Sequence, residues 1–193
     1  MGLKLTKLGQ KSVFENKLHM SIYVSCGLLG AGDVVCQGCE MLVNKNLHQK
    51  FNRNRTESMF LIGLAMAPFG QIWYFRLMEK LIPGAPSMEI ALKKVLADQI
   101  VAGPVFISFF LFGKELLEGR GGSVGITELK DKFLPLYMAS WCVWPPAQLL
   151  LFKFLPAERR FRYLAGVTFC WNFFLSWYTH KDLPLYIGKE KKK

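Results

Sequence analysis

The sequence is poor in the residues and motifs that catalysis uses most. Its 193 residues include three histidines. His19, His48 and His180 do not cluster with cysteines or acids at the spacing of metal ligands. The chain also lacks a glycine-rich phosphate loop, a dinucleotide fingerprint and a nucleophile elbow. We therefore expect a protein that is not an enzyme and that uses neither a metal nor a cofactor.

A disulfide framework is not expected either. The chain has five cysteines, an odd number, and all of them lie within apolar segments, unlike those of small secreted domains. Cys36 and Cys39 have the spacing of redox and zinc motifs, but neither a second pair nor a nearby histidine accompanies them. We interpret the cysteines as small buried hydrophobic residues.

Charge is also scarce over long stretches. Hydrophobic residues make up 51% of the sequence, and the mean hydropathy is +0.20. Five apolar runs contain one acid or no charge: Leu18–Cys39 with Asp33, Ser58–Phe75, Val95–Gly113 with Asp98, Phe133–Phe152 and Tyr163–Thr179. Each is close to the ~17–25 residues that a helix needs to cross a bilayer. Five such runs leave too little polar sequence to cover them, so we predict an all-α, polytopic membrane bundle of four to five spans.

Prolines and glycines mark the expected bends and connections. The first three helices are predicted over residues 18–43, 56–82 and 88–118, with Ser87 as an N-cap. Kinks are expected at Pro68, at Gly103–Pro104 and at Pro145–Pro146. The glycine-rich segment 119–125 is predicted to be an exposed linker.

The basic residues lie mainly outside the apolar runs. The net charge is +11, and Lys and Arg at the ends of spans can reach anionic lipid headgroups. We prefer this explanation to an RNA-binding surface and expect no sequence-specific binding of nucleic acid. Residues 1–17 form a basic segment similar in composition to mitochondrial targeting segments, residues 18–180 a single membrane domain, and residues 181–193 a basic, disordered tail.

Polar side chains within the runs are the candidate functional residues. A carboxylate in a span costs roughly 2.5–3.5 kcal/mol, so both acids should face the bundle and have partners. Such groups either hold helices together or line a path for a solute, and we favour the first. Gln148 is a candidate donor to carbonyls freed by Pro145–Pro146, and Trp73 and Tyr74 are assigned to an interfacial aromatic belt. The candidates are Asp33, Gln37, Asp98, Gln99, Gln148, Thr168, Asn172 and Ser176.

Several spaced motifs resemble those of a known membrane family. The C-terminal part reads W-x-x-W-P-x-x-Q, then F-x-x-x-P-x-x-x-R, then W-N-x-x-L-S, which is similar to the signature of the Mpv-seventeen and peroxisomal-membrane-protein-twenty-two family. Earlier residues match as well, among them Gly32–Asp33 and Asp98–Gln99. Leu151 and Gln71 depart from the family pattern, which often has Asn and His there. The signature residues are Pro68, Trp73, Trp141, Trp144, Pro145, Pro156, Arg160 and Trp171.

The resemblance implies a location and a non-enzymatic role. Within the family, the motifs around Pro68, Trp73 and Trp141 look most like the second Mpv-seventeen-like subgroup. This implies a mitochondrial inner-membrane protein linked to mitochondrial ribosome assembly and translation, with the ribosomal large subunit as a partner. Other members imply a peroxisomal membrane, mitochondrial DNA maintenance or a weakly selective channel, and homo-oligomerisation is left open. Arg160 is expected to clamp an acid inside the bundle.

Overall fold

The protein is an elongated bundle of helices. The structure, a computed structural model, describes residues 27–43, 50–84, 87–155 and 157–181, and every regular element in them is helical. The all-α prediction is therefore confirmed for these residues. A helix over residues 27–43 is followed by α2 (Arg53–Ile72), η1 (Trp73–Leu77), α3 (Met78–Leu81), α4 (Met88–Ala97), η2 (Asp98–Ala102), α5 (Gly103–Leu117), α6 (Gly122–Phe154) and α7 (Ala157–His180).

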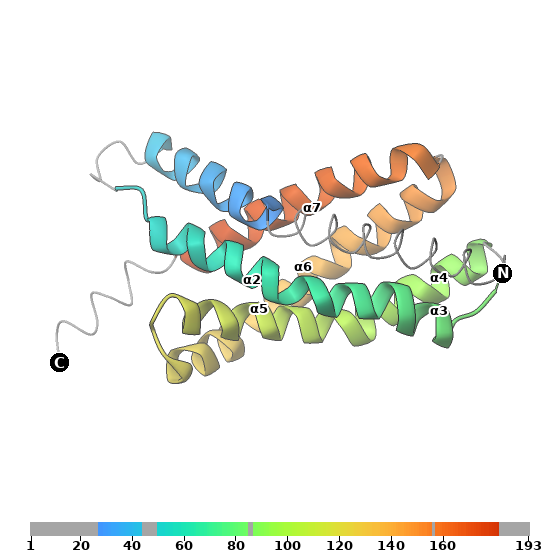
Figure 1. Ribbon diagram of the computed structural model, residues 1–193, viewed down its shortest axis with the longest axis horizontal. Coiled ribbons are helices and arrows are strands. Elements are labelled where there is room, and N and C mark those ends of the chain that lie inside the picture. The colour runs from blue at the N-terminus through green and yellow to red at the C-terminus, as the bar shows by residue number, and fades with distance from the viewer. Residues whose placement is uncertain (1–26, 44–49, 85–86, 156, 182–193) are drawn as a thin grey trace, which may run out of the picture.

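The helices run up and down the long axis of the molecule (Figure 1). α2, η1 and α3 form one continuous rod, and α4, η2 and α5 form a second. The α5–α6 connection lies at one end of the bundle, and the α6–α7 connection lies at the other (Figure 1). These rods agree with the helices predicted over 56–82 and 88–118. Residues 18–26 of the first predicted helix, together with segments 1–17 and 182–193, lie outside the described residues.

Side chains at the helix starts explain where two of the rods begin. Asn52 caps α2, because its side chain accepts a hydrogen bond from the backbone N–H of Arg55 at 3.2 Å. Ser87 caps α4 in the same way by accepting from Ile90 N–H at 3.2 Å, which confirms the predicted N-cap.

The predicted glycine-rich linker is shorter than expected. Gly119 and Gly121 do have positive φ angles of 77° and 85°, but α6 already begins at Gly122. A Cβ on Gly125 would lie 2.8 Å from the Phe112 ring. The linker prediction is therefore wrong for residues 122–125, which are helical. Gly125 serves a different purpose there: it lets the first turn of α6 pack closely against Phe112 of α5.

Two π-helical turns take the place of simple proline kinks. Pro104 has no N–H, and the Gly103 N–H donates to the carbonyl of Asp98 five residues earlier, closing the π-turn η2. The expected irregularity at Gly103–Pro104 is thus a π-turn, in which one extra residue enters the pattern of helical hydrogen bonds. α2 continues through Pro68 to Ile72 and then enters the second π-turn, η1. α6 is one helix through Pro135, Pro145 and Pro146.

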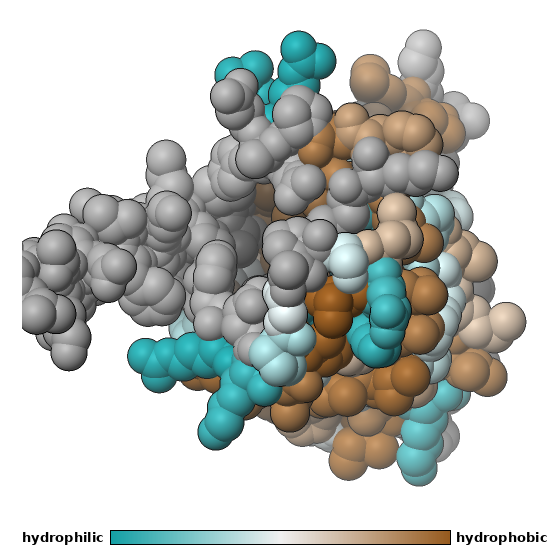
Figure 2. All heavy atoms as spheres, turned by 90° about the vertical axis from the view of Figure 1, so that its right-hand side faces the viewer, coloured by the Kyte–Doolittle hydropathy of each residue, from teal (hydrophilic) through white to brown (hydrophobic). Residues whose placement is uncertain are grey.

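The bundle buries polar residues and exposes apolar ones. On the rod Met88–Leu117, Ile100 and Val105 are 60% and 58% exposed, whereas Asp98 and Lys114 are 6% and 0% exposed. In Figure 2, brown apolar atoms cover most of the described surface at one end of the bundle, with teal hydrophilic side chains projecting among them. The buried apolar core joins helix 27–43, α2, α5, α6 and α7 through Leu29, Met59, Ile62, Ile107, Phe110, Leu111, Leu136, Trp171 and Leu175.

Among the described helices, the rod Met88–Leu117 is the one long and apolar enough by composition to cross a membrane. The other long helices contain the expected apolar runs, but prolines, tryptophans and polar residues interrupt these runs. The structure therefore confirms the helices of the predicted bundle and supplies one clear candidate span.

Helix 27–43 crosses α7 at a point where a residue larger than glycine would be crowded. A Cβ on Gly32 would lie 3.1 Å from the backbone nitrogen of Phe173 and 3.2 Å from the carbonyl carbon of Asn172. Backbone atoms cannot move aside as a flexible side chain can. We expect Gly32→Ala to lower the free energy of unfolding by about 1–3 kcal/mol, seen as a lower melting temperature in mild detergent. Gly38→Ala is the matched control on the same helix, since a Cβ there meets nothing within 4 Å. Equal melting temperatures for the two variants would contradict the close crossing.

Candidate functional site

The carboxylate of Asp33 is fully buried and receives hydrogen bonds from three helices. Its Oδ1 accepts from Arg55 Nε and from Ser176 Oγ, each at 2.6 Å. Its Oδ2 accepts from Thr56 Oγ1 at 2.6 Å and from Gln37 Nε2 at 2.8 Å. Asp33 is 0% exposed and Arg55 is 6% exposed. The expectation that Asp33 faces the bundle and has partners is confirmed.

The first turn of α2 is held against helix 27–43 by Gln37. This side chain lies one turn after Asp33, as the spacing predicted. Its Oε1 accepts from the Asn52 N–H at 2.7 Å, and its Nε2 lies 3.0 Å from the Asn52 carbonyl oxygen. Because Asn52 also caps α2, Gln37 fixes the helix start that carries Arg55 and Thr56.

The Arg55 guanidinium is shared between two acids and a hydroxyl. Besides Asp33, it pairs with Glu40 through Nη1 at 2.9 Å and donates to Ser176 Oγ through Nη2 at 2.7 Å. A buried charge is tolerated when it is paired and all its donors are used. Arg55 lies just before the helix predicted over residues 56–82, and the clamp was expected at Arg160, whose side chain lies outside the described residues. The Asn52 cap signal, which places Arg55 in a first helical turn, was the clue that was missed.

A second group of buried charges lies at the same end of the bundle, where α5 ends and α7 ends. Lys114 pairs with Glu115, and Arg120 pairs with both Glu115 and Glu118. His180 Nε2 lies 2.9 Å from Glu118 Oε1. Sequence spacing does not reveal this contact, because Glu118 is distant in sequence from His180 and folding brings the two side chains together.

The last turn of α7 links this group to the Asp33 network and to α6. His180 Nδ1 lies 2.8 Å from the carbonyl oxygen of Ser176, whose side chain binds Asp33. Lys132 Nζ donates to the carbonyl oxygen of Thr179 at 3.0 Å. One continuous polar network thus joins helix 27–43, α2, α5, α6 and α7.

Electrostatics keep the groups of the α5–α6 connection charged. Burial alone would raise the pKa of Glu118, but the hydrogen bond with His180 and the charges of Lys114 and Arg120 bring it below its usual value. Burial would likewise lower the pKa of Arg120, but its bonds to Glu115 and Glu118 raise it above the usual range.

The second acid, Asp98, lies where the two π-turns meet. Trp73 opens η1 and donates its indole N–H to Asp98 Oδ1 at 2.9 Å, and Asp98 itself opens η2. Gln148 Nε2 donates to Asp98 Oδ2 at 2.9 Å. Gln148 thus has Asp98 as a partner, which the sequence did not predict. The assignment of Trp73 to an interfacial aromatic belt is corrected, because its side chain is buried in the bundle.

Gln99, beside Asp98, joins the same rod to α6. Tyr137 donates its hydroxyl to the Gln99 carbonyl oxygen at 3.1 Å, and Ser140 Oγ lies 3.2 Å from Gln99 Oε1. Since Gln148, Tyr137 and Ser140 all belong to α6, the two predicted polar residues of η2 bind the same neighbouring helix.

The predicted polar stripe of α7 faces helix 27–43 at two of its three positions. Ser176 joins the Asp33 network, and Asn172 packs against Gly32. Asn172 is 5% exposed, and its amide nitrogen has no hydrogen-bond partner among the described residues. Thr168 is half-buried. A role for these residues in lining a path stays a prediction.

The signature residues are partly structural. Trp144 and Trp171 meet edge to face with ring centroids 6.1 Å apart, linking α6 to α7. Trp141 packs on Tyr137 within α6, Pro145 is half-buried and Pro68 is exposed. Pro156 lies outside the described residues. In the described part of the chain, no three His, Cys, Asp or Glu side chains are grouped as metal ligands would be.

The chemistry of these sites is that of interhelical bonding. Each buried carboxylate oxygen of Asp33 and Asp98 accepts at least one hydrogen bond from another helical segment. An unpaired buried acid would be costly, so each acid selects the arrangement in which its donors are present. This favours the interpretation of the polar residues as contacts that hold the bundle together.

Removal of Arg55 should therefore be far more damaging than removal of a nearby exposed arginine. We expect Arg55→Ala to cost about 3–5 kcal/mol, because it leaves Asp33 and Glu40 without their cation. Arg53→Ala is the control on the same helix turn: Arg53 is 86% exposed, and its loss should cost less than about 1 kcal/mol. Unfolding in detergent measures both. Asp33→Asn combined with Arg55→Met should recover part of the loss, and strict additivity of the two changes would contradict the pairing.

Comparison with known proteins finds a matching family model and several similar full-length proteins. The family model described as Mpv17 / PMP22 family matches residues 115–176. The protein "Mitochondrial inner membrane protein Mpv17" of Xenopus laevis is 31% identical over 90% of this chain and 96% of its own, and that of Danio rerio is 30% identical over 89% and 95%. "Protein sym-1" of Neurospora crassa is 34% identical over 78% and 84%. No solved structure matches. The chain belongs to the Mpv17 / PMP22 family and is a protein of the mitochondrial inner membrane.

Proposed function

We propose that the protein is a non-enzymatic, multi-span helical bundle that supports mitochondrial gene expression from the inner membrane. The multi-span arrangement is supported by a distribution of polarity opposite to that of a water-soluble protein, with charged residues inside and apolar residues outside. Asp33, Arg55, Lys114 and Glu115 are buried, whereas large apolar side chains are exposed along the described helices. In water this arrangement would be unfavourable, whereas in lipid the exposed apolar side chains meet hydrocarbon and these buried charges pair with one another inside the protein.

The spacing of charges along the rod Met88–Leu117 fits the thickness of a bilayer. The run Val95–Gly113 lies between Lys94 and Lys114 and is about 28 Å long at about 1.5 Å per residue. A hydrocarbon core is about 30 Å thick. The Lys114–Glu115–Arg120 group then lies at one membrane surface, and Asp98 lies about one turn inside the other.

The proposed role in gene expression rests on charge and on the family resemblance. The net charge is +11, and the basic residues are concentrated outside the apolar runs, where they can meet an anionic surface. The partner we propose is the large subunit of the mitochondrial ribosome, contacted during its assembly or during translation. The same basic surface would also serve a role in the maintenance of mitochondrial DNA.

Co-sedimentation tests this proposal. The native protein should sediment with mitochondrial ribosomal particles at low salt and be released as salt rises, because exposed charge pairs are screened. Two charge-matched variants sharpen the test. One replaces the lysines at 189, 191, 192 and 193 in the tail by Gln, and the other replaces Lys80, Lys93, Arg159 and Arg162, at the end of the bundle opposite to His180, by Gln. Only the set that faces the matrix should abolish co-sedimentation. Absence of the unmodified protein from ribosomal fractions at low salt would refute the proposal.

A weakly selective channel is the second candidate, and the α7 stripe favours it. Asn172 presents a buried amide nitrogen without a partner in the described residues, one turn from Ser176, whose hydroxyl binds Asp33. Such a group can bind water or a polar solute passing along α7.

Conductance in a planar bilayer distinguishes the channel from the purely structural interpretation. If α7 lines a path, Asn172→Leu should reduce conductance and Asp33→Asn should change ion selectivity, in protein that retains its helical content. Identical conductance and selectivity in all variants would count against a channel.

A further inference from the structure

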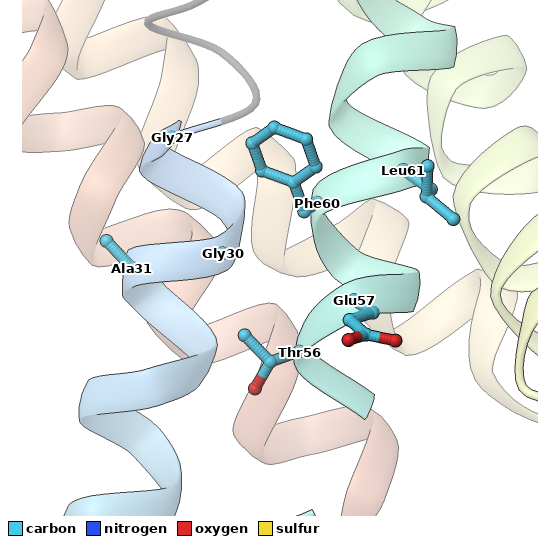
Figure 3. Close-up of a pocket in the computed structure, with 7 residues that line it drawn as sticks. All are labelled: Gly27, Gly30, Ala31, Thr56, Glu57, Phe60 and Leu61. Carbon is cyan, nitrogen blue, oxygen red and sulfur yellow. The ribbon is translucent and has the colours of Figure 1, made fainter. Parts of the chain in front are cut away.

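An apolar groove lies on the outer flank of the bundle between helix 27–43 and α2. Its volume is about 520 Å³, within the range of about 300–1,000 Å³ found for small-molecule sites. Figure 3 shows its two walls, with Phe60 projecting from α2 beside the turn that contains Gly30. The lining residues are Gly27, Gly30, Ala31, Thr56, Glu57, Phe60 and Leu61.

The groove exists because one wall, formed by Gly27, Gly30 and Ala31, carries little side-chain volume. A Cβ on Gly27 would meet nothing within 4 Å, and a Cβ on Gly30 would come no closer than 3.6 Å to Phe60. Gly32, two residues after Gly30, lies by contrast directly against α7. A Cβ on Gly27 would thus face open space and one on Gly30 would make an ordinary van der Waals contact with Phe60, so neither glycine is required by a close helix crossing.

The surroundings of the groove are those of a lipid-facing surface. Val34 and Val35 on helix 27–43 and Phe60, Leu61 and Leu64 on α2 are all 44–46% exposed. In a bilayer, an unfilled groove would deprive its walls of van der Waals partners. A flexible hydrocarbon chain can fill such a shape without needing a polar group there.

Charges at one edge of the groove select the headgroup. Glu57 lines the groove and pairs with Arg53, with Arg53 Nε 2.6 Å from Glu57 Oε1. Their side chains are 54% and 86% exposed, respectively, so both can turn to a ligand. A guanidinium binds phosphate well, and a carboxylate attracts an ammonium group. An anionic headgroup without an amine would meet Glu57 unfavourably.

From these features we propose that the groove binds one zwitterionic phospholipid. One acyl chain lies between Gly27–Ala31 and Phe60–Leu61, the phosphate lies at Arg53, and the ammonium group lies at Glu57. This inference rests on the proposed placement of the bundle in a membrane.

Photo-crosslinking in vesicles tests the site. The full chain is reconstituted in phosphatidylcholine vesicles that contain phosphatidylethanolamine or phosphatidylglycerol with a diazirine in the acyl chain, and labelled residues are mapped by mass spectrometry. We expect several-fold stronger labelling of 27–31 and 56–61 by phosphatidylethanolamine than by phosphatidylglycerol. Glu57→Gln should remove this preference, and Gly27→Leu should reduce labelling at 56–61 by filling the groove.

A control variant and an insertion assay separate the possible failures. Gly38→Leu adds the same side chain to the same helix where a Cβ also meets nothing within 4 Å, and it should label as the unmodified chain does. Equal labelling by both lipids, or unchanged labelling in Gly27→Leu, would overturn the lipid site, as would crosslinks from residues 1–26 into the groove. Resistance to carbonate extraction is measured on each sample; loss of that resistance would instead overturn the membrane placement.

Discussion

The bundle depends on supplying hydrogen-bond donors to the buried carboxylate of Asp33. Four donors meet it, and they come from helix 27–43, α2 and α7. A carboxylate without these donors would be costly in either a protein interior or a bilayer. The requirement fixes several features at once: the start of α2, the close crossing at Gly32, and the position of Ser176 on α7. In this sense the acid specifies the arrangement of helices more than it adds to their stability.

Asp98 plays the corresponding part at the other end of the molecule. It connects two π-turns through the Trp73 indole and connects the rod Met88–Leu117 to α6 through Gln148. π-Turns are less regular than α-helix and persist where other contacts support them. Pro104 removes one backbone donor, and the Asp98 contacts stabilise the resulting irregular turn. The two acids therefore anchor opposite ends of one bundle.

The sequence predicts the helices of this fold well and its long-range contacts less well. Apolar runs, proline positions and the Ser87 cap identify each described rod to within a few residues. Asp33, Gln37, Asp98 and Gln148 are all identifiable as inward-facing, because polar groups in apolar runs need partners. Their partners are not identifiable in this way. Arg55, Glu118 and His180 lie at the ends of apolar runs, where basic and acidic residues are common, and only the packing of distant helices shows which of them are buried.

The bundle has its charges inside and lipid outside, and labelling of single cysteines on the rod Met88–Leu117 tests this arrangement most directly. Val105→Cys and Ile100→Cys place a thiol on the exposed apolar face of the rod Met88–Leu117, in a background whose native cysteines have been replaced. In intact inner-membrane vesicles, both thiols should resist a charged maleimide, and a fluorophore attached at either position should be quenched by nitroxides on lipid acyl chains. Rapid reaction with the charged reagent, without quenching by the lipid nitroxides, would contradict the account.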